Sequence, residues 1–318
     1  MRIPTSLPTP QLDRKNVRCT VIVVTYNGKK EWYDKCFSSL LTSSIPLEII
    51  VVDNKSTDDT IDYISRNFQQ IKIIQNDENV GFAKANNIGL NIAYNDNKDY
   101  FFLLNQDAWV EHNTLEILIT VAEKKQEFGI FSPIHLTGSK SGFDKNFRNY
   151  FHYNSTTICA YECLYLKYQQ PILYESFFVN AAAWLITRKC VEIVGGFDTI
   201  MFKHYGEDNN YCQRVIYHKL KIGIVPTTTI CHDRAFRANN PLDPDIIFSI
   251  TYGNILLTKK ILKERLIEIF FKIIRGKEIS KGLKEIRFVI KKYQKIVKSR
   301  EINKIKGKGL EYLEIKEI

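Results

Sequence analysis

Short apolar runs alternate with amphipathic stretches through roughly the first third of the chain. The apolar runs are rich in β-branched residues and end at polar turn residues, as buried strands do, whereas the amphipathic stretches repeat with the period of a helix. Strands that alternate with helices form right-handed βαβ units, so we expect a parallel sheet covered by helices on both faces. The expected strands are residues 19–25, 47–52, 71–75 and 100–105, and the expected helices are residues 31–42, 61–68 and 82–95.

The fourth expected strand is an unbroken apolar and aromatic run that stops at Asn105, which is typical of a strand buried on both faces at the centre of a sheet. Ligands of open α/β sheets bind beyond the carboxyl ends of such strands. Polar side chains follow several of the strands and should therefore line one edge of this nucleotide-binding type of sheet. They are Thr25, Tyr26, Asn27, Asp53, Asn105, Gln106 and Asp107.

Neither a Gly-x-Gly-x-x-Gly turn nor a phosphate-binding loop of the ATPase type follows the first strand. A nucleotide can instead be held by a carboxylate on its base or ribose and by a metal ion across its diphosphate. Asp107 offers the hard oxygen ligand that such an ion prefers. Taken alone, a carboxylate after a strand can equally be a turn former.

The second half of the chain contains an acidic pair, Glu207 and Asp208, at the start of a helical pattern that runs to Leu220. Acids in the first turn stabilise a helix through its dipole, and one of them can also serve as a general base. Before this helix, residues 137–175 are irregular and rich in aromatic side chains, which could stack on a bound ligand or simply pack. Arg234 and Arg237 follow in a loop that could close over a diphosphate.

Most of the positive charge lies near the end of the chain. Residues 259–308 contain 18 Lys and Arg against 5 Asp and Glu, whereas the other residues contain 27 against 30, although the whole chain has a formal net charge of +10. A nucleic-acid enzyme would carry positive charge around its cleft, so we expect no nucleic-acid partner.

Apolar residues in this basic tail fall on one face of each of two expected helices, with Lys and Arg on the other faces. Two interpretations compete: the apolar faces lie on an anionic membrane, or they pack on the catalytic domain or a partner subunit. The faces are Leu262, Leu266, Ile269 and Ile273, and then Ile279, Leu283, Ile286, Ile290, Tyr293 and Val297.

The seven cysteines are odd in number and scattered, and the close pair Cys159 and Cys163 has no second pair that would complete a zinc site. We expect reduced thiols and a cytoplasmic location. No run of about 18 apolar residues occurs, and residues 1–17 contain three prolines without the apolar core of a signal peptide, so we expect a disordered arm there.

An ordered set of short strings in this chain resembles the family 2 glycosyltransferases, which have the GT-A fold, and it is most similar to their rhamnosyltransferase-like branch. The resemblance extends over residues 21–232. The strings are Val23 to Asn27, Val51 to Asn54 with Ser56 and Asp58, Asn79 to Gly89, Leu103 to Asp107, Gly195 to Asp198, Phe202, Gly206 to Asp208, and Arg214.

The resemblance implies a site for a nucleotide-activated sugar. Thr25 and Asn27 would line the nucleotide pocket, and Asp53 would bond to the base or ribose. Asp107 matches the last acid of the family's metal-binding motif, and His232 matches a further ligand, for Mn²⁺ or Mg²⁺. Asn105 stands where many members have an acid, and the rhamnosyltransferase-like branch shares this departure. The replacement lowers the negative charge of the site.

The resemblance also implies that Asp208 is the base that activates the acceptor hydroxyl, with Glu207 beside it. Trp184 and Tyr205 are the candidate surfaces on which an acceptor sugar would stack. Gly81 permits a tight turn before a helix whose amino terminus attracts phosphate. We expect Gly81, Lys84 and Asn86 to contact the donor.

The predicted organisation is an arm at residues 1–17, a GT-A domain at 18–258 and a basic helical tail at 259–318. The domain has a nucleotide-sugar half at 18–133 and an acceptor half at 134–258. We expect an inverting transferase that moves rhamnose or another hexose to a saccharide or lipid-linked acceptor in surface polysaccharide synthesis, at the inner face of the cell membrane. The alternative functions are a nucleotidyltransferase and a non-catalytic membrane-associated saccharide-binding protein. In either case the chain could form a homo-oligomer.

Overall fold

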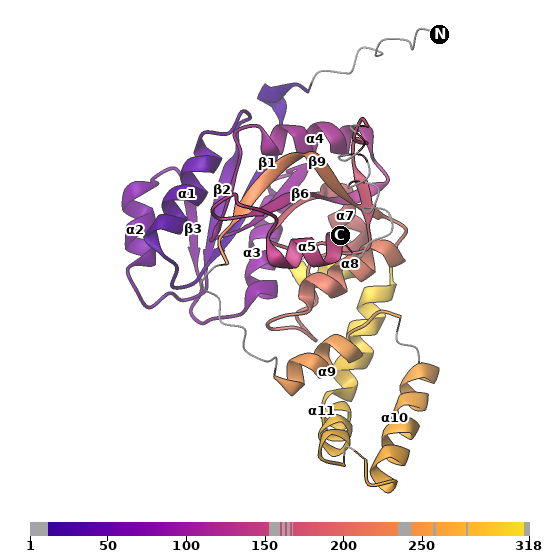
Figure 1. The fold of residues 1–318 in the computed structure, drawn as a ribbon. Helices are drawn as coiled ribbons and strands as arrows, with labels where there is room; N and C mark the ends of the chain where they lie inside the picture. Colours follow the sequence, from indigo (N-terminus) through magenta and orange to yellow (C-terminus); the bar gives the residue numbers. More distant parts are fainter. Residues whose placement is uncertain are drawn as a thin grey trace, which may run out of the picture.

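A mixed sheet of nine strands organises the molecule (Figure 1). The structure is a computed structural model, and it describes residues 12–152, 168–234, 243–256, 259–277 and 279–314, together with positions 160, 163 and 166. The main path of the sheet has the strand order β3-β2-β1-β4-β8-β6-β9-β5, and β7 pairs with β9.

The first four strands of the chain form the parallel half of the sheet, as the alternating pattern predicts. Thr25 at the end of β1 lies opposite Asp53 at the end of β2, and Val24 lies opposite Asn105 at the end of β4. The polar residues that follow these strands therefore meet at one edge. The elements are β1 (Cys19–Thr25), α1 (Lys30–Leu41), β2 (Glu48–Asp53), α2 (Thr60–Asn67), β3 (Lys72–Gln75), α3 (Phe82–Asn95) and β4 (Tyr100–Asn105).

The expectation of a wholly parallel sheet is wrong beyond β4. β8 pairs antiparallel with both β4 and β6, while β9 runs parallel to β6 and antiparallel to β5 and β7. β8 follows residues 138–182, whose described part contains α5 and β7, and antiparallel neighbours do not require a crossover helix. These strands are β5 (Ala108–Val110), β6 (Phe128–Thr137), β7 (Tyr174–Ser176), β8 (Ala183–Thr187) and β9 (Lys221–His232).

Helices cover both faces of the sheet and bury two apolar cores. Side chains of α1, α2 and α4 pack on one face, and those of α3, α7 and α8 pack on the other. The central strands thus meet helices on both faces, which explains why these strands are apolar on both faces. The remaining helices are α4 (Thr114–Lys124), α5 (Lys145–His152), α7 (Arg188–Val194), α8 (Glu207–Tyr217), α9 (Pro244–Tyr252), α10 (Lys259–Ile274) and α11 (Ile279–Lys304).

The basic tail extends from the body as a hairpin of α10 and α11, and its end returns to the catalytic domain (Figure 1). Asn303 Nδ2 donates to the buried Asp198 Oδ2 at 2.8 Å, and Gly196 N donates to Gly309 O at 3.0 Å. The short 3₁₀ helix η2 (Lys308–Leu313) lies here, and Leu313 belongs to the same core as α7 and α8. The last part of the tail is therefore packed into the domain that precedes it.

The amino-terminal arm is ordered in its described part. Arg14–Asn16 forms a 3₁₀ helix, η1, and Arg14 Nε donates to Glu116 at 2.5 Å. The expected disorder is thus wrong for residues 12–17, whose Leu12 and Val17 pack against the core. Residues 1–11 lie outside the described part. None of the helices in the described ranges has the length and apolar character needed to cross a membrane.

Candidate active site

A pocket of about 580 Å³ opens beyond the carboxyl ends of β1 and β4, where the sequence places the ligand. This volume suits a small molecule. The pocket brings together the turn after β4 and the first turn of α8, which are about a hundred residues apart in the chain. It is lined by Val24, Tyr26, Phe82, Asn105, Gln106, Asp107, Asn146, Asn149, Tyr150, Phe178, Asn180, Ala181, Ala182, His204, Tyr205, Glu207, Asp208 and Arg234.

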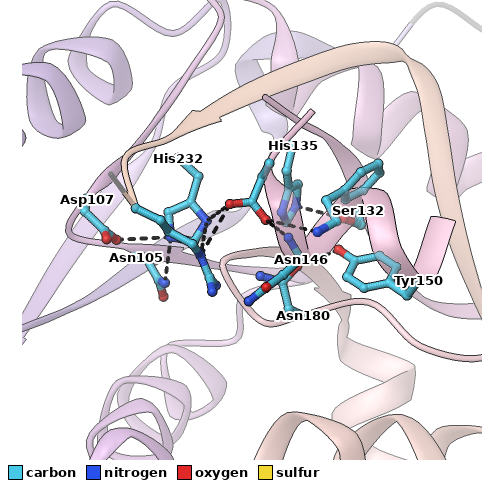
Figure 2. A network of polar contacts seen from close by, with 11 residues as sticks. Asn105, Asp107, Ser132, His135, Asn146, Tyr150, Asn180 and His232 are labelled. Carbon is cyan, nitrogen blue, oxygen red and sulfur yellow. Dashed lines mark hydrogen bonds and ion pairs between the residues drawn. The ribbon is translucent and has the colours of Figure 1, made fainter. Parts of the chain in front are cut away.

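Asp107 lines this pocket, and His232 lies beside it (Figure 2). The antiparallel pairing of β5 with β9 sets Ala108 opposite His232, so the strand register brings the two side chains together. His232 Nε2 lies 3.3 Å from Asp107 Oδ1 and 3.4 Å from Asn105 Nδ2. Both Asp107 and His232 are buried.

The other ring nitrogen of His232 faces a second set of charges. Arg234 Nε donates to His232 Nδ1 at 3.2 Å, and Asp144 Oδ2 lies 3.7 Å from the same nitrogen and 3.4 Å from Arg234 Nε. Asp144 is itself fixed, because its Oδ1 accepts hydrogen bonds from the backbone N–H groups of Asn146 and Phe147 at the start of α5. When Nδ1 accepts from Arg234, the neutral ring carries its hydrogen on Nε2, toward Asp107. A metal at Nε2 requires the hydrogen on Nδ1 instead, and Asp144 is the carboxylate that would then orient the ring.

Asp107 and His232 fit a divalent ion. A buried carboxylate and an imidazole that converge are suitable ligands for Mn²⁺ or Mg²⁺. Among the described residues, no group of three or more His, Cys, Asp or Glu is placed to hold a metal. An ion at this pair would therefore complete its coordination with oxygens of water and of a bound diphosphate, as Mg²⁺ does in many nucleotide sites.

Glu207 and Asp208 begin α8 and also line the pocket. Burial, together with the neighbouring charge of Asp208, raises the pKa of Glu207 to about 8, so this carboxyl is protonated at neutral pH. Burial also raises the pKa of Asp208. A carboxylate whose pKa has risen toward neutrality is a better general base.

The loop before α8 is shaped by left-handed backbone. Tyr205 has φ +63° and Gly206 has φ +91°, and a Cβ on Gly206 would lie 2.5 Å from Ile250 Cγ1. The Tyr205 ring is 61% exposed and borders the pocket, where a sugar could stack on it. Gly81 has φ +87°, and a Cβ there would lie 2.2 Å from Lys203 O, so glycine allows the turn before α3 to approach this loop.

Thr25, Asn27 and Asp53 form a hydrogen-bonded edge beside the pocket. Thr25 Oγ1 donates to Asp53 Oδ1 at 2.8 Å, and Ser56 donates to Asp53 through both its backbone N–H and its hydroxyl. Asn27 Oδ1 accepts from Thr57 N at 2.8 Å. Thr25, Asn27 and Asp53 do not line the pocket. Tyr26 and Gln106 do line it, and the Gln106 side chain hydrogen-bonds to the backbone N–H and C=O of Tyr26.

Three predicted contact residues do not face the pocket. Trp184 is fully buried on β8 and stacks on Phe197, so the expectation that it stacks on a sugar is wrong. Asn86 is also buried, and its amide donates to Phe82 O within α3, so this side chain is not placed to contact a nucleotide sugar. Lys84 lines a separate hollow between α3 and η2.

One wall of the pocket comes from residues that the sequence analysis did not single out. Asn146 and Tyr150 project from α5, and the Tyr150 hydroxyl donates to Asn180 Oδ1 at 2.5 Å (Figure 2). Tyr150 is one of the aromatic residues of segment 137–175 that were expected to stack on an acceptor or to pack, whereas Asn146 and Asn180 were not predicted. Arg234 lines the pocket, and Arg237 lies outside the described residues.

Comparison with known proteins identifies the family. The model of glycosyl transferase family 2 matches residues 20–193, which is more than half of the chain. The chain belongs to glycosyl transferase family 2. The family 2 match includes the parallel half of the sheet and β8, and it ends before α8.

Relatives agree with the family 2 assignment. An uncharacterized glycosyltransferase of Haemophilus influenzae is 35% identical over 109 residues, which are 33% of this chain and 32% of that protein. The glycosyltransferase GlyA of Streptococcus pneumoniae is 32% identical over 32% of this chain and 14% of its own length. The dTDP-rhamnosyl transferase RfbF of Shigella flexneri is 21% identical over 68% of this chain and 69% of its own. The chain thus matches only about a third or less of the length of the first two.

A solved structure supports the GT-A type of fold. The crystal structure of GalNAc-T7 with UDP, GalNAc and Mn²⁺ superimposes with a TM-score of 0.53 and 14% identity, over 74% of this chain and 48% of that one. At this identity the likeness concerns the fold. The expected fold class is therefore confirmed.

Proposed function

We propose that this chain is an inverting glycosyltransferase that moves a sugar from a nucleoside diphosphate donor to a saccharide or lipid-linked saccharide acceptor. The observation that carries the proposal is that one pocket is lined by Asp107, whose carboxylate contacts His232, and by Glu207 and Asp208. The first pair suits the diphosphate end of a donor, and the second suits proton transfer at the acceptor end.

Asp208 would take the proton from the acceptor hydroxyl while the hydroxyl oxygen attacks the anomeric carbon and the nucleoside diphosphate leaves. Glu207, protonated at neutral pH, would donate a hydrogen bond beside it. Asp107 and His232 would hold Mn²⁺ or Mg²⁺, which supplies positive charge next to the departing diphosphate. Tyr205 would stack on a sugar, and Arg234 would face the phosphate groups.

Rhamnose is the donor sugar to test first, because RfbF, named as a dTDP-rhamnosyl transferase, matches more than two thirds of the chain. The presence of Mn²⁺ and UDP in the crystal of GalNAc-T7 supports a metal-assisted nucleotide site in the same fold. A lipid-linked acceptor would place the enzyme at the inner face of the cell membrane, as the basic tail also suggests.

The experiment is a binding and turnover screen of the purified chain against dTDP-rhamnose, UDP-hexoses, UDP-galactofuranose and GDP-sugars, with Mn²⁺, with Mg²⁺ and with a chelator. Calorimetry measures binding, and release of nucleoside diphosphate measures turnover. We expect one donor class to bind in a metal-dependent manner and to turn over slowly. If no nucleotide sugar binds with or without metal, the proposal is wrong.

A further inference from the structure

The α10–α11 hairpin has an inner apolar face that is already packed against the rest of the chain. Leu262 of α10 and Phe288, Val289 and Ile296 of α11 are buried in one cluster with Met201 and Phe202 of the loop before α8 and with Phe248 and Tyr252 of α9. This cluster fixes the hairpin to the catalytic loop. It also leaves the apolar residues on the other sides of both helices without a place in the core.

These remaining residues form what we call the outer apolar face. They are large side chains with exposed fractions from 38% to 74%, and they make up nine of the twenty exposed large hydrophobic residues in the described ranges. Such a concentration in a short segment indicates an interaction surface. The outer apolar face consists of Ile267, Phe270, Phe271 and Ile274 of α10 and Ile279, Leu283, Ile290, Tyr293 and Val297 of α11.

The spacing places each set on one side of its helix. In α10 the members occupy positions i, i+3, i+4 and i+7, and in α11 successive members lie three, four or seven residues apart, which are spacings of one helix face. An open groove of about 410 Å³ between the two helices is lined by Ile267 and Phe270 of α10 and by Tyr293 of α11. The two sets therefore meet along the groove and present a common surface.

A row of exposed basic residues runs along α11 beside its outer apolar residues. The row follows the same helical period, and four of its five members come directly after an apolar position of the expected face. It consists of Lys284, Arg287, Lys291, Lys295 and Lys298.

The positive charge of the hairpin favours an anionic bilayer over a second copy of this chain as the partner. Two copies of this chain that met through these faces would bring two strongly basic helices together, so the like charges oppose self-association. An anionic bilayer instead offers acyl chains to the apolar residues and headgroups to the basic row, at about 1 kcal/mol per Lys or Arg near the surface. The rest of the chain, with its slight excess of acidic residues, would not compete for the same surface.

We infer that the outer apolar face lies in the interface of an anionic phospholipid bilayer, with the basic row at the headgroups. The inference deepens the proposed membrane location by naming the surface and the lipid class. Because the inner face of the hairpin holds the loop that leads to Glu207, binding in this way fixes the position of the catalytic pocket relative to the lipid.

The test is flotation of the full chain with vesicles of phosphatidylcholine, with and without phosphatidylglycerol. We expect binding that requires phosphatidylglycerol and weakens with salt. The triple variant Phe270→Ser, Phe271→Ser, Ile290→Ser should lose at least tenfold in vesicle affinity, whereas the exposed control pair Leu41→Ser and Tyr217→Ser should bind as the wild type does.

A charge variant separates the two contributions. Lys291→Gln with Lys295→Gln should weaken vesicle binding roughly thirtyfold at low salt, and the exposed control pair Lys72→Gln with Lys124→Gln should not. Equal binding to both kinds of vesicle, or full binding by the triple variant, would overturn the inference. So would a wild-type dimer that the triple variant converts to monomers without any vesicle binding.

Donor binding in solution distinguishes this inference from the proposed function. Every hairpin variant should bind the soluble nucleotide sugar as the wild type does, because the changed side chains lie outside the pocket. If no donor binds while the vesicle result holds, the transferase proposal fails and the lipid surface stands. If donor binding is intact and vesicle binding is absent, the reverse applies.

Discussion

The pocket contains two acidic sites that the fold treats in opposite ways. Asp107 Oδ1 lies 3.3 Å from an imidazole nitrogen, whereas Glu207 lies beside the carboxyl of Asp208. Burial and a neighbouring carboxyl therefore raise the pKa of Glu207 to about 8. Under the proposed function, the first site would hold a cation and the second would hold and exchange a proton.

The largest effect should come from the proton-transfer site. Asp208→Asn removes the base while keeping its shape, so kcat should fall about a thousandfold with the donor dissociation constant unchanged. Steady-state kinetics and calorimetry measure the two quantities. The surface variant Asp59→Asn is the matched control. A kcat within tenfold of the wild type would assign the base to another residue.

At the cation site the loss should appear in binding instead. Asp107→Asn takes away the carboxylate that faces His232, so metal-dependent donor affinity should fall roughly a hundredfold or more. Donor titrations with Mn²⁺ and with a chelator measure this. Wild-type affinity in the variant would show that Asp107 does not hold the ion.

Asp144 should raise the metal affinity of the same site through its contact with His232. Asp144→Asn keeps the oxygen that caps α5 but removes the charge behind His232, so Mn²⁺ affinity should fall roughly tenfold. The helix content should not change. The control Asp243→Asn makes the same replacement at the cap of α9. Unchanged Mn²⁺ affinity would mean that Asp144 only caps its helix.

Glu207 should produce a pH-dependent effect on stability. Its raised pKa means that the folded state retains the proton, so its contribution to the free energy of unfolding is complete below about pH 4.5 and is lost as the pH rises through about 8. Glu207→Gln cannot ionise, and its stability relative to the wild type should rise over this window by roughly 4 kcal/mol at most.

Thermal unfolding from about pH 5 to pH 9 tests this, with the exposed Glu31→Gln as control. A difference between Glu207→Gln and the wild type that does not vary with pH would contradict the raised pKa.

The parallel half of the sheet could be predicted because its signals are local. Each strand there is a continuous apolar run, and a polar residue marks where it ends, as Asp53 and Asn105 do. The convergence of these ends at one edge then follows from parallel topology. The direction of β8 could not be predicted, because it depends on the path of the irregular segment before it.

Side-chain direction was the other quantity that the sequence did not reveal. Trp184 lies one strand away from the pocket, yet its ring packs on Phe197 in the core. In α11 two apolar stripes lie side by side, and the period alone did not show that Phe288 and Ile296 pack inward while Ile290 stays exposed. Both outcomes depend on which neighbour covers a face, and distant parts of the chain supply that neighbour.

The most direct test of the division of labour between the two acidic sites is a count of bound Mn²⁺ by electron paramagnetic resonance in the presence of the donor nucleotide. The wild type and Asp208→Asn should bind Mn²⁺ equally and lower the free-ion signal by the same amount. Asp107→Asn should not bind Mn²⁺ and should leave the free-ion signal unchanged. Loss of Mn²⁺ binding in Asp208→Asn with full binding in Asp107→Asn would contradict the account.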